Sequence, residues 1–190
     1  MHRELLVAVA EATKAEINGV FYRHSHPERP LQGSASGGRW GPEGTYSVLY
    51  LGRPPESVVV EAYRHLVDDD EDLTGEMVGP RLFSTVEVSV TNILDLRDST
   101  AQALVGLDHA ALCSDVDEHA PCRRVGQAAH QLGLHGVIAP AATDMGETLA
   151  LFDEQLPASE LPHVVETAIW SHLPPDPRRL RAVEDGAETA

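Results

Sequence analysis

Side chains of the kinds that bind and cleave phosphorylated ligands lie in the first third of the chain: Arg23, Arg39, Tyr50 and Glu61. Arg39 directly follows the glycine pair 37–38. Glycines let a backbone approach a ligand closely, and an arginine can hold a phosphate through its planar fork of donors. The pattern therefore indicates an anion-binding turn, although a turn whose arginine pairs with a surface carboxylate would have the same sequence.

The sequence around Arg39 and Glu61 adds to the pattern. Trp40 follows Arg39, and an indole there could shield a site or stack on a flat ring. Glu61 lies within the run VVVEAY, where a carboxylate is unusual unless it has a task or a partner. The alternative for Glu61 is a buried ion pair with Arg23 or Arg39, and both interpretations place it near the arginines.

Metal and thiol chemistry are weakly indicated. His24 and His26 resemble a pair of ligands on one face of a strand, but a metal site needs three or four ligands, and no third candidate has suitable spacing. We expect no metal. Cys122 precedes two arginines, a setting that can activate a thiol. We nevertheless expect Cys113 and Cys122 to be small packing residues.

Composition limits the class of protein. A net charge of -16 argues against general nucleic-acid binding, which needs a basic surface, so an anionic ligand would depend on locally placed arginines. The 190 residues suffice for one domain with its own core. Two cysteines and no apolar segment near 20 residues long favour a cytoplasmic protein.

Hydrophobic periodicity predicts mixed helices and strands without a regular alternation, which favours an α+β fold. We expect one domain over residues 1–173, with a helix at 4–17 ended by Asn18-Gly19, and a flexible tail at 174–190. Loops are expected at 27–44 and 68–72. The other predicted helices are 56–67, 99–106 and 121–133, and the predicted strands are 20–25, 45–52, 81–96, 136–142, 148–152 and 163–170.

Several motifs together resemble a known family. They are FYR at 21–23, GGRWGPEGTYSVLYLG at 37–52, the glutamate at 61, and VGQAAHQLGLHGVIAPAA at 125–142. In their order and spacing they are similar to the RES domain, the toxin of bacterial RES–Xre toxin–antitoxin modules. The resemblance covers about residues 20 to 155.

This resemblance implies a fold related to ADP-ribosyltransferases, in which small β-sheets surrounded by helices form a central cleft for NAD⁺. It implies that Arg23 and Arg39 bind the pyrophosphate, that Tyr50 lines the nicotinamide side and that Glu61 serves the reacting ribose. The cofactor-binding residues it points to are Arg23, Gly38, Arg39, Trp40 and Tyr50. It also implies a cognate antitoxin, an Xre-like protein with a DNA-binding helix-turn-helix.

The family resemblance leaves the reaction open. Its members break the nicotinamide–ribose bond, with water, inorganic phosphate or a protein as the acceptor of ADP-ribose. The chain departs from the family pattern at Gly41, where asparagine is usual, and at Ala141, where serine is usual. We interpret Ala141 as the mark of a subgroup. A protein-modifying ADP-ribosyltransferase and a non-catalytic binding protein remain alternatives.

Overall fold

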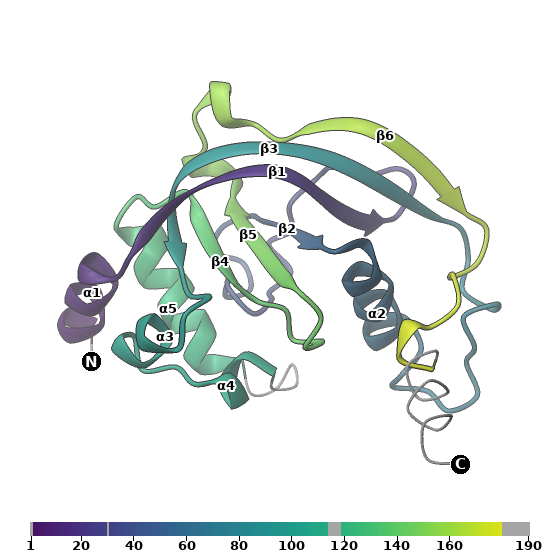
Figure 1. Ribbon diagram of the computed structural model, residues 1–190, viewed down its shortest axis with the longest axis horizontal. Helices are drawn as coiled ribbons and strands as arrows, with labels where there is room; N and C mark the ends of the chain where they lie inside the picture. The colour runs from purple at the N-terminus through teal and green to yellow at the C-terminus, as the bar shows by residue number, and fades with distance from the viewer. Residues whose placement is uncertain (1, 30, 114–118, 180–190) are drawn as a thin grey trace, which may run out of the picture.

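The computed structural model describes residues 2–29, 31–113 and 119–179. It confirms the α+β class, and Figure 1 shows long curved strands above a group of helices. The helices are α1 (His2–Glu11), α2 (Pro55–Leu66), α3 (Ser99–Leu104), α4 (His109–Cys113) and α5 (Ala120–Gln131), with 3-10 turns at Asp153–Gln155 and Ala158–Glu160. The strands are β1 (Lys14–Ser25), β2 (Val48–Arg53), β3 (Arg81–Asp95), β4 (Gly136–Pro140), β5 (Glu147–Phe152) and β6 (His163–Trp170).

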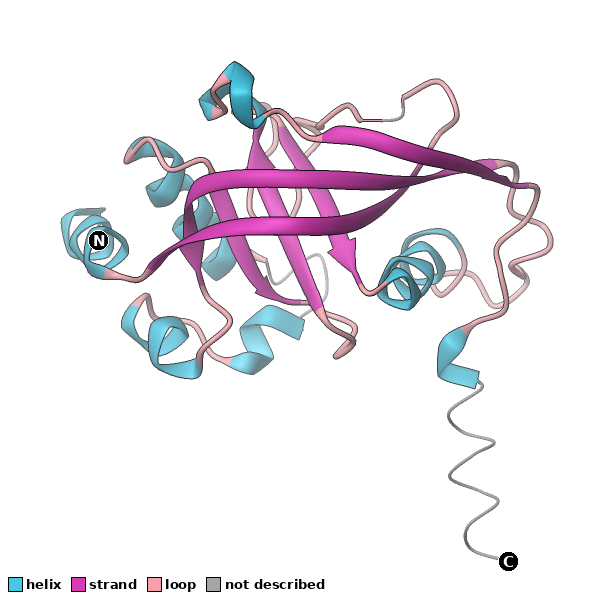
Figure 2. Ribbon diagram, turned by 45° about the horizontal axis from the view of Figure 1, so that its top comes forward, coloured by secondary structure: helices cyan, strands magenta, loops and turns pink. Residues whose placement is uncertain are grey.

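The expectation of several small β-sheets is wrong: the strands form one six-stranded sheet in the order β1-β2-β5-β4-β3-β6. Because β1 also pairs with β3 along most of its length, the pairings of β1, β2, β5, β4 and β3 close into a ring. Among the pairings of the described strands, that of β3 with β4 is parallel and the others are antiparallel. Figure 2 shows the long strands β1, β3 and β6 crossing over the shorter ones. The ring is joined between β1 and β2 by a single pair, Tyr22 with Gly52.

Alternating apolar residues fill the inside of this ring. Along β3, valines alternate with exposed residues, so every second side chain points inward, as a strand with one buried face requires. Leucines and isoleucines of the facing strands complete this first core. Its buried members are Ile17, Phe21, Leu49, Leu51, Val86, Val88, Val90, Ile93, Ile138, Leu149 and Leu151.

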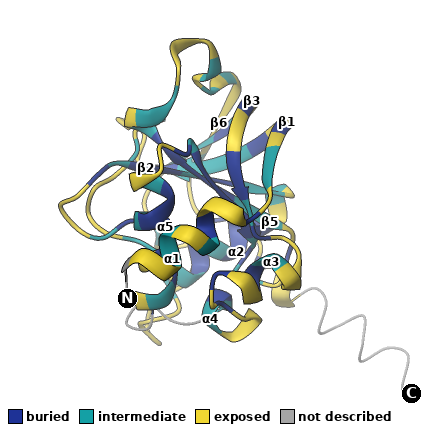
Figure 3. Ribbon diagram, turned by 90° about the vertical axis from the view of Figure 1, so that its left-hand side faces the viewer, coloured by how far each residue is buried: buried dark blue, intermediate teal, exposed yellow. Residues whose placement is uncertain are grey.

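A second core lies on the other face of β2, β5 and β4, where α5 and α1 cover the sheet. Val125, Ala128 and Ala129 of α5 pack with Val137 of β4 and Phe152 of β5. Figure 3 shows the exposed outer side of α1 and the buried stretches of α5. This packing holds α5 beside the loop that precedes β2.

The end of the described chain packs against α2. Leu173 is buried with Val59 and Tyr63 of that helix. Arg178 forms ion pairs with Asp68, at 2.6 Å, and with Asp176. The first residues of the predicted tail are therefore attached to the domain, while 180–190 lie outside the described residues.

The predicted helix at 4–17 is wrong. The helix ends at Glu11, and Lys14 donates hydrogen bonds to the carbonyls of Val9, Ala10 and Ala12 that the helix end leaves open. Residues 14–25 form one long strand, because they pair with β3 over almost its whole length. The strand predicted at 163–170 is present with the same ends, the other predicted helices and strands are present with shifted ends, and the short helix α4 was not predicted. In the part of the chain that the structure describes, no helix could cross a membrane.

Candidate functional site

The loop before β2 folds into a tight turn around Arg39. The amide of Gly38 donates to the carbonyl of Gly41 at 2.9 Å, which closes the turn. The phenol oxygen of Tyr50, on β2, accepts a hydrogen bond from the Trp40 amide at 3.0 Å. On the other side, Nε of Arg123, on α5, donates to the Gly38 carbonyl at 3.0 Å. The turn is therefore held between the sheet and α5.

Glycine is required in this turn by close packing. A β-carbon on residue 38 would lie 2.6 Å from the phenol oxygen of Tyr50. A β-carbon on residue 41 would lie 2.7 Å from Cγ2 of Val48, so the asparagine usual in the family pattern would not fit without rearrangement. A β-carbon on Gly126 of α5 would overlap the Trp40 carbonyl. These three glycines allow the loop to lie close to both β2 and α5.

Arg39 is directed from this turn toward α4 and α2. Its Nη1 donates to the carbonyl of Ala111 at 3.1 Å. Burial raises the pKa of Tyr50 and of Glu61, and the positive charge of Arg39 opposes this effect at both groups, so its guanidinium lies within electrostatic reach of both. The structure thus brings together three of the predicted site residues, which come from a loop, a strand and a helix.

Tyr50 remains a neutral phenol. Burial raises its pKa to about 12, against the opposing effects of the Trp40 amide and of the positive charges of Arg39 and Arg123. A neutral phenol can position a ligand through its ring and its hydroxyl, but at neutral pH it does not act as a base. Tyr50 is therefore suited to lining a site.

Glu61 lies on α2 with its side chain 27% exposed. Its Oε2 is 3.3 Å from Nε2 of His65, one turn along the helix. Burial raises its pKa, but the hydrogen bond and charge of His65, with the charges of Arg64 and Arg39, bring the pKa below its ordinary value. Glu61 is therefore an ionised carboxylate at neutral pH, and its hydrogen-bond partner His65 was not anticipated from the sequence.

Arg23 has a position that differs from the other predicted residues. It lies on β1, and its two Nη atoms each donate at 2.9 Å, one to the backbone carbonyl of Tyr50 and one to that of Gln32. Its buried Nε has no hydrogen-bond partner among the described residues. Burial lowers its pKa, and the charge of Asp153 opposes this. Arg23 thus contacts the backbone behind Tyr50, and its role toward a phosphate remains a prediction.

Trp40 does not have the position that ring stacking requires. Its side chain is 1% exposed and packs in the core beside α5. Its carbonyl accepts a hydrogen bond from the hydroxyl of Tyr46 at 2.9 Å. The expected stacking role of Trp40 is therefore corrected to a packing role, because a buried indole has no free face to offer a ligand.

Sequence reasoning missed the residues that frame this site from later segments. Arg123 holds Gly38, and Arg64 of α2 donates to the carbonyl of Ala142 at 2.8 Å. The connection between β4 and β5, residues 141–146, thereby reaches α2, where Thr143 also contacts Ser57 at 3.2 Å. The one available signal was that Arg64 follows Glu61 by three residues, the spacing of neighbours on a helix face.

His24 and His26, the two histidines considered as metal ligands in the sequence, have different surroundings. Burial, then the positive charges of Arg81, His65 and Arg23, lower the pKa of His24 to about 3. Nη2 of Arg81 lies 3.4 Å from Nδ1 of His24. His26 is exposed beside Glu28, at 4.0 Å.

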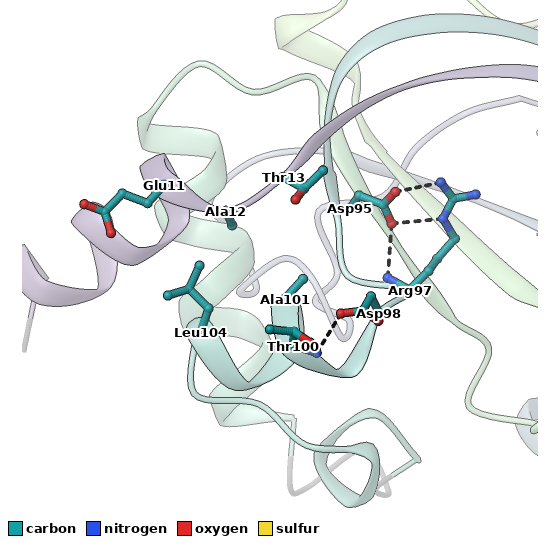
Figure 4. Close-up of a pocket in the computed structure, with 9 residues that line it drawn as sticks. All are labelled: Glu11, Ala12, Thr13, Asp95, Arg97, Asp98, Thr100, Ala101 and Leu104. Atoms are coloured by element: carbon teal, nitrogen blue, oxygen red, sulfur yellow. Dashed lines mark hydrogen bonds and ion pairs between the residues drawn. The ribbon is translucent and has the colours of Figure 1, made fainter.

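A surface pocket lies away from these residues. It is formed where α1, β1, β3 and α3 meet (Figure 4), and Asp95 and Arg97 form a bidentate pair on one wall of it. Arg23, Arg39, Tyr50 and Glu61 do not line this pocket. The shape of this pocket alone does not indicate a reaction, so the candidate site is the cluster of Arg39, Tyr50 and Glu61.

Comparison with known proteins identifies the family. Residues 16–176 match the RES domain, most of the chain. The chain belongs to the RES domain family. This confirms the resemblance seen in the sequence, and the match includes all four residues predicted to be catalytic.

Relatives of this RES chain are the proteins named NAD(+) phosphorylase MbcT from Mycobacterium bovis and Mycobacterium tuberculosis. Each is 26% identical over 144 residues, which is 74% of this chain and 76% of the relative. Among solved structures, the M. tuberculosis MbcT–MbcA toxin–antitoxin complex contains a chain with a TM-score of 0.79 and 24% identity. The alignment covers 89% of this RES chain and 93% of the other, so the two share a fold.

Proposed function

We propose that this protein is the toxin of a bacterial toxin–antitoxin module and that it degrades NAD⁺ by breaking the nicotinamide–ribose bond. The observation that carries the proposal is the convergence of Arg39, Tyr50 and Glu61, from three separate segments, in a member of the RES family. The relatives named NAD(+) phosphorylase support the same substrate. We further propose that the fold is ADP-ribosyltransferase-like and that the protein acts in the cytoplasm, where its two free cysteines stay reduced.

The chemistry of the bond explains why these residue types suffice. Nicotinamide leaves as a neutral molecule from a pyridinium, so its departure needs no strong acid and no metal. The positive charge that develops on the ribose is the difficulty. The ionised carboxylate of Glu61 would stabilise this charge, and such stabilisation is strong in a site sheltered from water.

The other residues would position the substrate. Arg39 would hold the pyrophosphate, and Tyr50 would line the nicotinamide side with its neutral ring. Binding energy from the pyrophosphate would thereby keep the ribose aligned with Glu61. Arg23 would contribute to the same end of the site, either directly or by fixing the backbone of Tyr50, whose carbonyl it contacts.

We propose inorganic phosphate as the acceptor. Phosphate would attack C1 of the ribose as the bond to nicotinamide breaks, giving ADP-ribose phosphate and free nicotinamide. Arginines are suited to bind this second anion, and Arg64 and Arg123, which contact the backbone of Ala142 and Gly38 near the cluster, support this proposal in addition to Arg39. The name of the MbcT relatives favours phosphate over water.

Product analysis tests the proposal. Purified protein is mixed with NAD⁺, with and without phosphate, and the products are identified by mass spectrometry. We expect ADP-ribose phosphate only when phosphate is present. ADP-ribose in both samples would show hydrolysis. ADP-ribose attached to protein would show an ADP-ribosyltransferase instead.

Variants of α2 give the matched comparison. Glu61→Gln keeps the shape of the side chain but removes its charge, and should lower kcat by about 10²–10³-fold. Glu56→Gln alters an exposed glutamate on the same helix and should leave the rate unchanged. Unchanged NAD⁺ in the unaltered protein, or equal rates for Glu61→Gln and Glu56→Gln, would contradict the proposed role of Glu61.

The proposed partner is a cognate antitoxin, Xre-like and carrying a DNA-binding helix-turn-helix. The MbcT chain with the same fold was solved in complex with an antitoxin, MbcA, which supports this proposal. The net charge of -16 suits a basic partner. Co-expression with an Xre-like cognate antitoxin should yield a complex that does not consume NAD⁺. A complex with full activity would contradict inhibition at the site.

A further inference from the structure

Three side chains capable of binding a metal ion meet at the surface between α4 and the β4–β5 connection. His109 and Cys113 lie one turn apart on α4, and Asp144 lies in the connection between β4 and β5. The ring Nε2 of His109 is 3.0 Å from Oδ1 of Asp144. The sulfur of Cys113 is 3.5 Å from the same nitrogen and 3.6 Å from the same oxygen.

These separations agree with those of ligands around one zinc ion. Zinc bonds of about 2.3 Å to sulfur, 2.1 Å to nitrogen and 2.0 Å to oxygen, at tetrahedral angles, place sulfur about 3.6 Å from nitrogen and 3.5 Å from oxygen. The same geometry places nitrogen about 3.3 Å from oxygen. Each observed distance is within about 0.3 Å of its expected value. One ion could therefore contact all three atoms with only small side-chain rotations.

The chemistry of the three donors also favours zinc. A thiolate, an imidazole and a carboxylate are the ligand types of zinc, whereas magnesium and calcium prefer oxygen alone. The side chains of His109 and Asp144 are 65% and 69% exposed, so an ion could enter from solvent. Three protein ligands leave a fourth position for water.

We propose that His109, Cys113 and Asp144 form a zinc site that joins α4 to the β4–β5 connection. Both segments also contact the candidate site, because the carbonyl of Ala111 accepts from Arg39 and that of Ala142 accepts from Arg64. A bound ion would therefore fix two walls of that site. The zinc site itself does not depend on the proposed NAD⁺ chemistry.

Spectroscopy of the metal-free full chain, produced without a histidine tag, tests the site. Titration with Co²⁺, a spectroscopic substitute for zinc, should give a thiolate-to-cobalt charge-transfer band that saturates at one ion per chain. Added Zn²⁺ should remove this band. Zinc at about 100 times its Kd should raise Tm by about 5–10 °C, because the folded chain alone holds the three ligands together.

Substitutions identify the ligands. Cys113→Ser should abolish the charge-transfer band, and Asp144→Asn should weaken Co²⁺ binding by more than about 100-fold, beyond the loss usual for an outer-shell partner. Asparagine is suitable because Asp144 has a left-handed backbone (φ 56°) that asparagine tolerates. His26→Gln removes an exposed histidine elsewhere and should bind as the unaltered protein does.

Three results would overturn the proposal. One is the absence of the band in the unaltered protein. Another is a band that persists in Cys113→Ser, because the ligand would then be Cys122. The third is equal affinity of Asp144→Asn and the unaltered protein, which would remove the carboxylate from the site.

Discussion

The contact between Gly38 and Tyr50 allows a prediction with a magnitude. A methyl group on residue 38 would lie 2.6 Å from the phenol oxygen, which is held by the Trp40 amide. Because Gly38 does not have a positive φ, the cost of Gly38→Ala is steric, about 1–3 kcal/mol. Tyr50→Phe removes the acceptor of the Trp40 amide and costs about 1–3 kcal/mol.

The double variant should be more stable than the sum of these costs implies. Removing the oxygen relieves the shortest contact of the methyl group and leaves the ring carbon at 3.1 Å, a tight contact that a small shift of the ring would accommodate. We expect a favourable coupling of at least about 1 kcal/mol, measured by urea unfolding of the four proteins. In thermal unfolding, each kcal/mol corresponds to roughly 2–4 °C.

A matched control is available at Gly79. A β-carbon there would meet no atom within 4 Å, so Gly79→Ala should be additive with Tyr50→Phe. If Gly38→Ala and Tyr50→Phe are also additive, within about 0.5 kcal/mol, the hydroxyl does not lie against residue 38. The reasoning about how the turn is held would then be refuted.

Three further predictions concern pH and packing. Burial and nearby positive charge lower the pKa of His24 from 6.5 to about 3. As the pH falls below about 6.5, the free energy of unfolding should therefore decrease by up to about 1.4 kcal/mol per pH unit. His24→Asn should reduce this slope, measured by urea unfolding. The hydrogen bond from Arg178 lowers the pKa of Asp68 from 3.8. The ionised pair therefore stabilises the fold above pH 3.8, and this stabilisation is lost as the pH falls through the pKa of the folded state. Arg178→Ala should flatten this part of the acid-unfolding curve, and an unchanged curve would exclude the pair. Gly41→Asn, which restores the family's usual residue, should lower Tm by roughly 3–10 °C because it meets Val48, and an unchanged Tm would show that the turn adapts.

Sequence periodicity was sufficient for most of the regular elements, but not for the first helix or for α4. The alternating valines of β3 and the apolar face of α2 are local signals, and the structure confirms both elements. The prediction of a helix at 4–17 was wrong because the position of Ile17 fits the apolar spacing of a helix as well as that of a strand. Its state is decided by pairing with Val90, a partner about 70 residues away that local periodicity does not reveal.

The candidate site was predictable only in part. Arg39, Tyr50 and Glu61 could be selected because a glycine-rich turn, a strand and a helix follow each other within a short segment. Arg64 and Arg123 could not, because their place depends on how α2 and α5 pack around the sheet. The burial of Trp40 could not be predicted either, because its indole packs with residues from later helices and strands.

The ring of strands has one weak join, and this has a consequence for local opening. Between β1 and β2, a single residue pair replaces an extended ladder, and the guanidinium of Arg23 reaches across from β1 to the Tyr50 carbonyl on β2. The Arg23 side chain therefore links β1 to β2 where the backbone pairing is short. Amide protons of β1 and β2 near this pairing should exchange with solvent before those of the β1–β3 ladder. Local opening there would displace Tyr50 while most of the sheet stays paired.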